Sequence, residues 1–269
     1  MKIIFNHFLN KTNNLDKLLI SLVFLFPFLL SISIFFADLF ASISALIVIA
    51  LFFLKENKKI FFQIKFELYF FIVFYIILLL SLIFSISISK SFLPSFFYFR
   101  YFLFIIGIYY LFKKYTFFKN IFFYSLIFTF LIISIDSFIQ FLLGYNILGY
   151  KVGGDPTPYL TSFFDDEKKL GSYLVRLLPL ILSMIYIINL NKYSNYIILI
   201  FGALIFLSSE RTALFLFFIV SIFYFLIIQK KIKFLIISSL IIISFFTFNE
   251  KLRYKYLDYT FQQFGFIET

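Results

Sequence analysis

The chain has 269 residues, of which 63% are hydrophobic and 14% are charged, and its mean hydropathy is +1.03. Soluble globular domains are nearer about 45–50% apolar, whereas apolar runs long enough to span a bilayer recur here from Leu18 to Phe248. This composition excludes an ordinary soluble domain and predicts an all-α, polytopic membrane protein. The formal net charge of +11 therefore indicates lysines in cytoplasmic loops, and we expect no nucleic acid as a partner.

Two residue types that hold metals in many proteins are nearly missing. The chain has no cysteine, which excludes disulfides and thiolate metal sites. Its single histidine, His7, lies in the polar N-terminal segment, which excludes a histidine-rich metal site. We therefore expect neither a metal nor a cofactor.

The predicted elements begin with a cytoplasmic segment over 1–17, followed by a transmembrane domain over 18–248. The first apolar run is long, lacks a small-x-small cleavage site and is followed at once by a second run. It therefore predicts a retained helix rather than a signal peptide. Residues 18–54 are long enough for two spanning helices of about 20 residues each, with the turn expected near Ala37-Asp38.

The later apolar runs predict seven further helices, separated by polar or Gly/Pro-rich segments. The third helix covers about 67–88, the fourth runs from after Pro94 to about Phe112, and the fifth ends near Phe141. The sixth covers about 170–189, the seventh and eighth are short helices within about 194–228 that break at Ser208–Arg211, and the ninth covers about 233–248. The segment 142–168, which contains GYKVGGDPTP, is predicted to be an outer loop. Residues 249–269 are polar again and are expected to begin a periplasmic segment.

The lysines predict the orientation. With the N-terminus in the cytoplasm, the inner segments hold 14 lysines and three acidic residues, against 10 basic and 10 acidic residues on the other side. Nine helices with a cytoplasmic N-terminus and a periplasmic C-terminus satisfy the positive-inside rule in every loop. All four arginines then lie at the outer side: Arg100, Arg176, Arg211 and Arg253.

The stretch FLSSERTALFLF, Phe206 to Phe217, places Glu210 and Arg211 side by side in an apolar run. Ionised side chains are costly wherever water is absent. Lysines on the inner side both before and after this stretch require two crossings between them, so the pair falls at the outer turn. One interpretation is a helix-end anchor in which Glu210 is the local partner of Arg211, and the other is a ligand site at the membrane face.

Arg176 lies about two turns, or roughly 10 Å, into the sixth predicted helix. Lys169, Ser172, Tyr173 and Arg176 recur at i, i+3, i+4 and i+7, so they share one stripe. A cation at that depth faces protein or a water-filled cavity rather than lipid. We favour a site role for Arg176 over an ion pair within the bundle, for instance with Asp136.

Arg100, about two turns past Pro94, mirrors Arg176 in the fourth predicted helix. Asp136 and Gln140 lie one turn apart at the outer end of the fifth helix and can complete a polar cluster with Arg100. A solvated carboxylate at a helix end is the other interpretation of Asp136, and we prefer it to a catalytic role.

The stretch SFFDDEKK holds Asp165, Asp166 and Glu167 just before the sixth helix. A carboxylate beside arginines can act as a general base. Acidic residues before a helix also cap it and interact favourably with its dipole. The cap is the preferred interpretation of Asp165 and Asp166, which leaves Glu167 as the candidate base.

Three stretches together resemble the O-antigen ligase and O-antigen polymerase superfamily. DSFIQFLLGYNILGY (Asp136–Tyr150) is similar to the family's Asp…Gln…Gly-Asn…Gly outer segment. SFFDDEKKLGSYLVRLLPL (162–180) is similar to its Phe-Phe-x-Asp-Glu…Gly-Ser-Tyr stretch that opens a helix, and LSSERTAL (207–214) to its Glu-Arg-Thr/Ser-Ala helix start. Their order, spacing and helix context agree with the family.

The resemblance implies a metal-independent glycosyltransferase of the bacterial inner membrane. Such enzymes move a glycan from undecaprenyl pyrophosphate to lipid A-core or to another lipid-linked repeat at the periplasmic face, and arginines hold the diphosphate. This fits the outer arginines, because cations aimed at the leaving group stabilise its developing charge. Taking the resemblance together with the polar residues above, we expect Arg211, Arg176 and Glu167 to be catalytic and Arg100, Asp136, Gln140, Lys169 and Glu210 to bind substrate.

The chain also departs from the family. Its ligases usually carry a histidine in a large periplasmic loop followed by further helices, whereas this chain has no outer histidine and ends where that loop would begin. Tyr159 stands where related sequences often have arginine. We therefore expect a partial chain, or an enzyme that acts without the histidine.

Two other functions fit the composition. A transporter or flippase of an anionic glycolipid ranks second, because such folds place charges near the membrane midplane and carry internal repeats, neither of which the sequence shows. A non-catalytic membrane fragment ranks third. In each case membrane lipids are expected to surround the helices.

Overall fold

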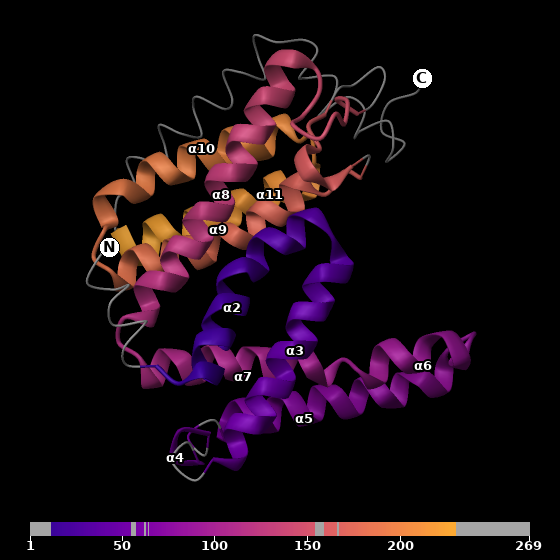
Figure 1. Cartoon of the computed structure of the whole chain (residues 1–269). Helices are drawn as coiled ribbons and strands as arrows, with labels where there is room; N and C mark the ends of the chain where they lie inside the picture. The colour runs from indigo at the N-terminus through magenta and orange to yellow at the C-terminus, as the bar shows by residue number, and fades with distance from the viewer. Residues whose placement is uncertain are drawn as a thin grey trace. The chain divides into compact units, whose positions relative to one another are not determined.

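The computed structural model describes residues 12–54, 58–61, 63, 65–153, 159–165 and 167–229. Within these ranges the protein is all-helical, with two isolated β-bridges and no strand. The chain divides into two compact units, Met1–Thr129 and Phe130–Thr269, and the boundary falls inside the helix α8 (Phe118–Leu143) (Figure 1).

Among the described residues, six helical segments are long and apolar enough to cross a membrane. They are α2 (Asn14–Ile32), α3 (Ile34–Phe53), α6 with α7 (Ile88–Phe96 and Phe99–Lys114), α8, α9 (Leu170–Ile187), and α11 (Arg211–Phe223) with the π-helix that continues it over Tyr224–Gln229. Two shorter apolar segments are Leu68–Phe84, which includes most of α5 (Lys65–Leu80), and Asn191–Leu207, which includes α10 (Ser194–Leu207). The single turn α4 covers Lys58–Phe61. The prediction of a multi-pass helical membrane protein is confirmed. The helix expected over about 233–248, Arg253, the segment 249–269, His7 and Asp166 lie outside the described residues.

Two helix boundaries differ from the prediction. The first chain turn is at Ser33, not near Ala37-Asp38, because Ser33 has an extended backbone (φ −157°, ψ 125°) that ends α2 and begins α3. The fourth helix was expected to start after Pro94, but α6 already contains this proline. Proline removes one helical hydrogen bond and crowds the preceding turn, and α6 ends two residues later, at Phe96.

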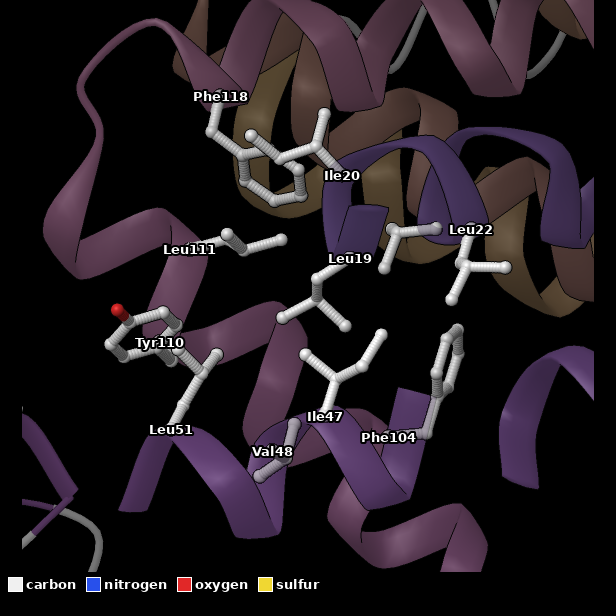
Figure 2. Close-up of a cluster of buried hydrophobic side chains, with 11 residues drawn as sticks. Leu19, Ile20, Leu22, Ile47, Val48, Leu51, Phe104, Tyr110, Leu111 and Phe118 are labelled. Carbon is white, nitrogen blue, oxygen red and sulfur yellow. The ribbon is translucent and has the colours of Figure 1, made fainter. Parts of the chain in front are cut away.

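The core of the first unit is built from α2, α3 and α7. Their buried side chains include Leu19 of α2, Ile47 and Val48 of α3, and Phe104 and Leu111 of α7. Figure 2 shows these side chains directed toward one another. Burial of each large aliphatic side chain contributes roughly 1.5–3 kcal/mol, so this cluster fixes α7 against α2 and α3.

An acidic side chain is paired with a basic one near each end of α7. Near its C-terminus, Lys114 Nζ lies 2.8 Å from Oδ2 of the fully buried Asp16, which also accepts hydrogen bonds from Tyr110 and Tyr115. Near its N-terminus, Arg100 Nη2 lies 2.9 Å from Asp38 Oδ2. The predicted topology puts Asp16 with Lys114 on one side of the membrane and Asp38 with Arg100 on the other, and these contacts agree with that pairing.

Close approach of α3 and α7 depends on Gly107. A Cβ atom at this position would lie 2.7 Å from Val48 Cγ2 and 3.6 Å from both Leu19 Cδ atoms. We expect Gly107→Ala to lower the free energy of unfolding by about 1–3 kcal/mol through overpacking, measured as a lower midpoint of thermal unfolding in detergent. Adding Val48→Ala removes the clashing methyl group and should recover part of the loss. A double variant no more stable than Gly107→Ala would contradict this packing.

The second unit brings the starts of two helices to the same end. α9 packs against both α10 and α11, and α10 runs back along α9. Phe130 of α8 stacks on Phe201 of α10 with 4.1 Å between the ring centroids, and a Cβ at Gly202 would lie 2.9 Å from Phe217 of α11. Because α10 returns the chain, α9 and α11 begin at the same end of this unit.

Candidate anion site at the starts of α9 and α11

The carboxylate of Glu210 joins the first turns of α9 and α11. Its Oε1 accepts a hydrogen bond from the Gly171 N–H (2.6 Å), and its Oε2 accepts from the Ser172 N–H (2.9 Å) and Oγ (2.5 Å). Glu210 is itself the N-cap residue of α11, and its carbonyl oxygen accepts from the Leu214 N–H. The first N–H groups of a helix have no partner within the helix, so this buried carboxylate caps α9 from a different helix.

This cap differs from the expected one. The sequence assigned the cap of this helix to the acidic residues that directly precede it, Asp165 and Asp166. In the structure Lys169 is the N-cap residue of α9 and its side chain makes no capping bond, whereas Glu210 bonds two of the first N–H groups. Asp165 is exposed, with φ 55°.

Gly171 allows the two helices to come this close. A Cβ atom on Gly171 would lie 2.4 Å from Ser208 Oγ and 3.1 Å from both Ala213 Cβ and Glu210 Oε1. Ser209, just before Glu210, has φ 60°, a region that residues other than glycine rarely adopt. A small residue on α9 and a strained turn before α11 together let the Glu210 side chain reach the first turn of α9.

Two cations lie within electrostatic range of this carboxylate. Arg211 is the first residue of α11, and Lys168 precedes α9 with its Nζ 5.1 Å from the centroid of the Tyr159 ring. Burial lowers the pKa of the Lys168 ammonium, the neighbouring Glu210 carboxylate raises it, and the Arg211 guanidinium lowers it. Both cations therefore lie within electrostatic range of one another, at an end of the unit where two helix dipoles are positive.

The predicted stripe on α9 lies along its less buried side. Ser172 and Tyr173 are half-buried, and Lys169 and Arg176 are exposed. Ser172 is bonded to Glu210, and Lys169 forms an ion pair with Glu167. The structure thus brings Glu210 close to Arg211 and to the start of the stripe, while Arg176 lies about two turns further along α9.

Asp136 and Gln140 of α8 hold the loop that follows this helix. Both are fully buried. Asp136 accepts hydrogen bonds from Ser162 Oγ (2.6 Å) and the Ile147 N–H (2.9 Å). Gln140 Oε1 accepts from the N–H groups of Thr161 (2.9 Å) and Ser162 (2.8 Å). Their side chains are engaged by the loop, and their substrate-binding role stays a prediction.

Ser162 is the residue at which these bonds converge. It has φ 52°, a conformation that costs a non-glycine residue of order 1–3 kcal/mol unless its surroundings hold it. Its N–H donates to Gln140, its Oγ donates to Asp136, and its carbonyl oxygen accepts from Asn146 Nδ2 at 2.7 Å. The network therefore fixes the chain just before the segment that leads to Lys168 and α9.

Arg100 belongs to the first unit, where its partners are Asp38 and Tyr101. The sequence grouped it with Asp136 and Gln140, which belong to the second unit. The contacts that the structure shows for Arg100 are therefore a different set from the predicted cluster, and its substrate-binding role stays a prediction.

Sequence reasoning missed Lys168, Gly171, Asn146 and Ser162 as parts of the site. Lys168 looked like one more lysine in the charged stretch DDEKK, and only its contact with Tyr159 and its charged neighbours distinguish it. Gly171 and Asn146 had a signal, because both lie inside the stretches that resemble the O-antigen ligase superfamily. Ser162 also begins one of these stretches, but nothing in the sequence predicted its partners, since a serine in a loop can bond many different groups.

The three stretches that carry the resemblance contact one another. Asp136 and Asn146 of the first bond Ser162 of the second, and Gly171 and Ser172 of the second bond Glu210 of the third. Residues far apart in the sequence are thus joined by buried hydrogen bonds into one constellation. None of the family models, curated proteins or solved structures compared with this chain matches it.

Proposed function

We propose that this protein is a membrane glycosyltransferase of the O-antigen ligase or polymerase type. It transfers a glycan from undecaprenyl pyrophosphate to a lipid or saccharide acceptor, lipid A-core or a growing lipid-linked polysaccharide, at the periplasmic face of the bacterial inner membrane. The proposal includes nine spanning helices, a cytoplasmic N-terminus and a periplasmic C-terminus. The observation that supports it most is the junction at Glu210, which groups Arg211 and Lys168 with two helix starts.

This junction suits a diphosphate leaving group. Because Glu210 already accepts from the first N–H groups of α9, the attraction comes from the two cations, and the arginine guanidinium can hold two phosphate oxygens at once. In the proposed reaction the acceptor oxygen attacks the anomeric carbon, the bond from that carbon to the diphosphate oxygen breaks, and the diphosphate leaves with the electron pair. Arg211 and Lys168 stabilise the charge that develops on it.

The other predicted residues have distinct roles in this proposal. Arg176, exposed along α9, contacts the diphosphate or the adjoining sugar, and Glu167 accepts the proton of the acceptor hydroxyl. Lys169 forms the ion pair with Glu167 and so orients it. Asp136 and Gln140 act through the loop that they hold.

The direct test uses the full chain, purified and reconstituted in nanodiscs. Labelled undecaprenyl-pyrophosphate-linked glycan is mixed with lipid A-core or with a second lipid-linked glycan, and products are resolved by gel and mass spectrometry. We expect a glycosylated acceptor that forms equally well in the presence of EDTA. Passage of a fluorescent glycolipid across proteoliposomes without any transfer product would support the flippase alternative and overturn the proposal.

A further inference from the structure

We propose that Glu210 is a positioning residue that keeps the diphosphate-binding cations together, and that it does not itself contact the substrate. This inference rests on the proposed function for the identity of the ligand, but the clasp formed by Glu210 with Gly171 and Ser172 is a property of the fold. The sequence suggested Glu210 as a substrate-binding partner of Arg211. The structure assigns its carboxylate to another helix.

The hydrogen bonds of the Glu210 carboxylate leave little of this group accessible to a ligand. Both carboxylate oxygens accept hydrogen bonds, three in all, and the residue is only 6% exposed. A buried carboxylate also repels a diphosphate, since like charges close together are strongly unfavourable in a medium of low dielectric constant. Direct contact with the leaving group is therefore the less favourable use of this side chain.

What Glu210 does control is the position of its neighbours. Arg211 follows Glu210 directly and begins α11, and Lys168 lies three residues before Gly171, whose N–H donates to the Glu210 carboxylate. If the clasp opens, the first turn of α9 and the first turn of α11 can separate, and the two cations separate with them. Precise placement of the groups that bind the leaving group governs the rate, because small displacements weaken their action on the transition state.

Gly171 offers a second way to open the same clasp. Gly171→Ala keeps the Glu210 carboxylate and every charge but places a Cβ atom 2.4 Å from Ser208 Oγ. If Glu210 acts by holding the helices together, Gly171→Ala and Glu210→Ala have the same effect. Glu210→Gln keeps the shape and one acceptor oxygen, so it should retain part of the clasp.

The experiment uses the absence of cysteine from the chain. Ser208→Cys places a single thiol at a fully buried position next to Gly171 of the clasp. Ser194→Cys places a single thiol at a fully buried position at the start of α10. Each reporter is combined with Glu210→Ala, Glu210→Gln or Gly171→Ala in the full chain. The rate of labelling by a maleimide is measured in detergent, and glycan transfer is measured in parallel.

We expect Glu210→Ala and Gly171→Ala to speed labelling of the Ser208→Cys thiol by about tenfold or more, since local opening replaces several buried hydrogen bonds. Labelling of Ser194→Cys should not change, and Glu210→Gln should be intermediate between the parent and Glu210→Ala, because its amide nitrogen cannot accept the hydrogen bond that a carboxylate oxygen accepts. Slow labelling of the Ser208→Cys thiol in the Glu210→Ala variant would overturn the inference. Fast labelling of both the Ser208→Cys and the Ser194→Cys thiols would also overturn it, because it would mean that the whole second unit had lost its structure. Loss of transfer in Glu210→Gln with the thiol still protected would point to direct contact with substrate. The labelling result stands whether or not transfer is ever observed, so the two proposals can fail separately.

Discussion

Arg211→Ala should lower the rate of glycan transfer by about 10²–10³-fold, the loss typical of removing one strong donor to a developing negative charge. Arg211 is the first residue of α11, next to the carboxylate that joins α9 to α11. Its guanidinium is always charged and offers a planar fork of donors. Alanine removes both the charge and the fork, while the backbone of α11 and the Glu210 clasp remain.

Three further variants make this result specific. Arg211→Lys keeps the charge but not the fork, so it should recover only part of the rate. Lys168→Ala should lower the rate less than Arg211→Ala, because the guanidinium remains in place. Lys192→Ala is the matched control, since it removes a cation from the turn between α9 and α10, at the opposite end of these helices, and should leave transfer unchanged.

The measurement is the initial rate of product formation in nanodiscs at equal amounts of folded protein. In cells, the corresponding result is loss of surface glycan at a normal level of the protein. Full transfer by Arg211→Ala, or an equal loss in Lys192→Ala, would show that the junction of α9 and α11 is not where the diphosphate binds.

The largest effect on stability should come from Asp136→Ala. The substitution leaves Ser162 Oγ and the Ile147 N–H without their acceptor, and hydrogen bonds to a charged group contribute about 1.5–3 kcal/mol each. We expect a loss of about 3 kcal/mol or more in the free energy of unfolding, measured by thermal unfolding in detergent. The loop over 144–153 should also become sensitive to protease, because Ser162 loses one of the bonds that hold its positive φ.

The same helix supplies the control for Asp136→Ala. In the part of the chain that the structure describes, Ser134 Oγ donates to the carbonyl oxygen of Phe130 in its own helix and to no other residue, so Ser134→Ala should change the free energy of unfolding by no more than about 0.5 kcal/mol. Asp136→Asn keeps one acceptor oxygen for the Ile147 N–H and should be intermediate. Equal stability of Asp136→Ala and Ser134→Ala would show that the network does not hold the loop.

The positions of the apolar helices illustrate what the sequence alone could predict. An apolar run of about 20 residues forms a helix in a bilayer whatever its neighbours are, because its backbone must satisfy its own hydrogen bonds there. The six long segments and the two shorter ones therefore fall where apolar runs predicted them. The boundaries at Ser33 and Pro94 were missed because they depend on single backbone conformations that composition does not specify.

Candidate site residues were predicted from residue type and spacing, and their partners could not be. The sequence identified Glu210 and Arg211 as unusual, because two charges in an apolar run are unusual wherever they lie. It paired Glu210 with its neighbour, but the carboxylate bonds residues 38 and 39 positions away. It likewise grouped Arg100 with Asp136, whereas the structure pairs Arg100 with Asp38.

Local hydropathy, together with glycine and proline, was enough to predict a multi-pass helical membrane protein and the order of the helices in the part of the chain that the structure describes. Only the tertiary structure decided which donors each buried carboxylate receives: Ser162 and Ile147 for Asp136, Gly171 and Ser172 for Glu210. The reason is physical. A buried charge must be satisfied, but any donor that the packing brings within reach can satisfy it, and packing is a property of the whole helical unit rather than of any one segment.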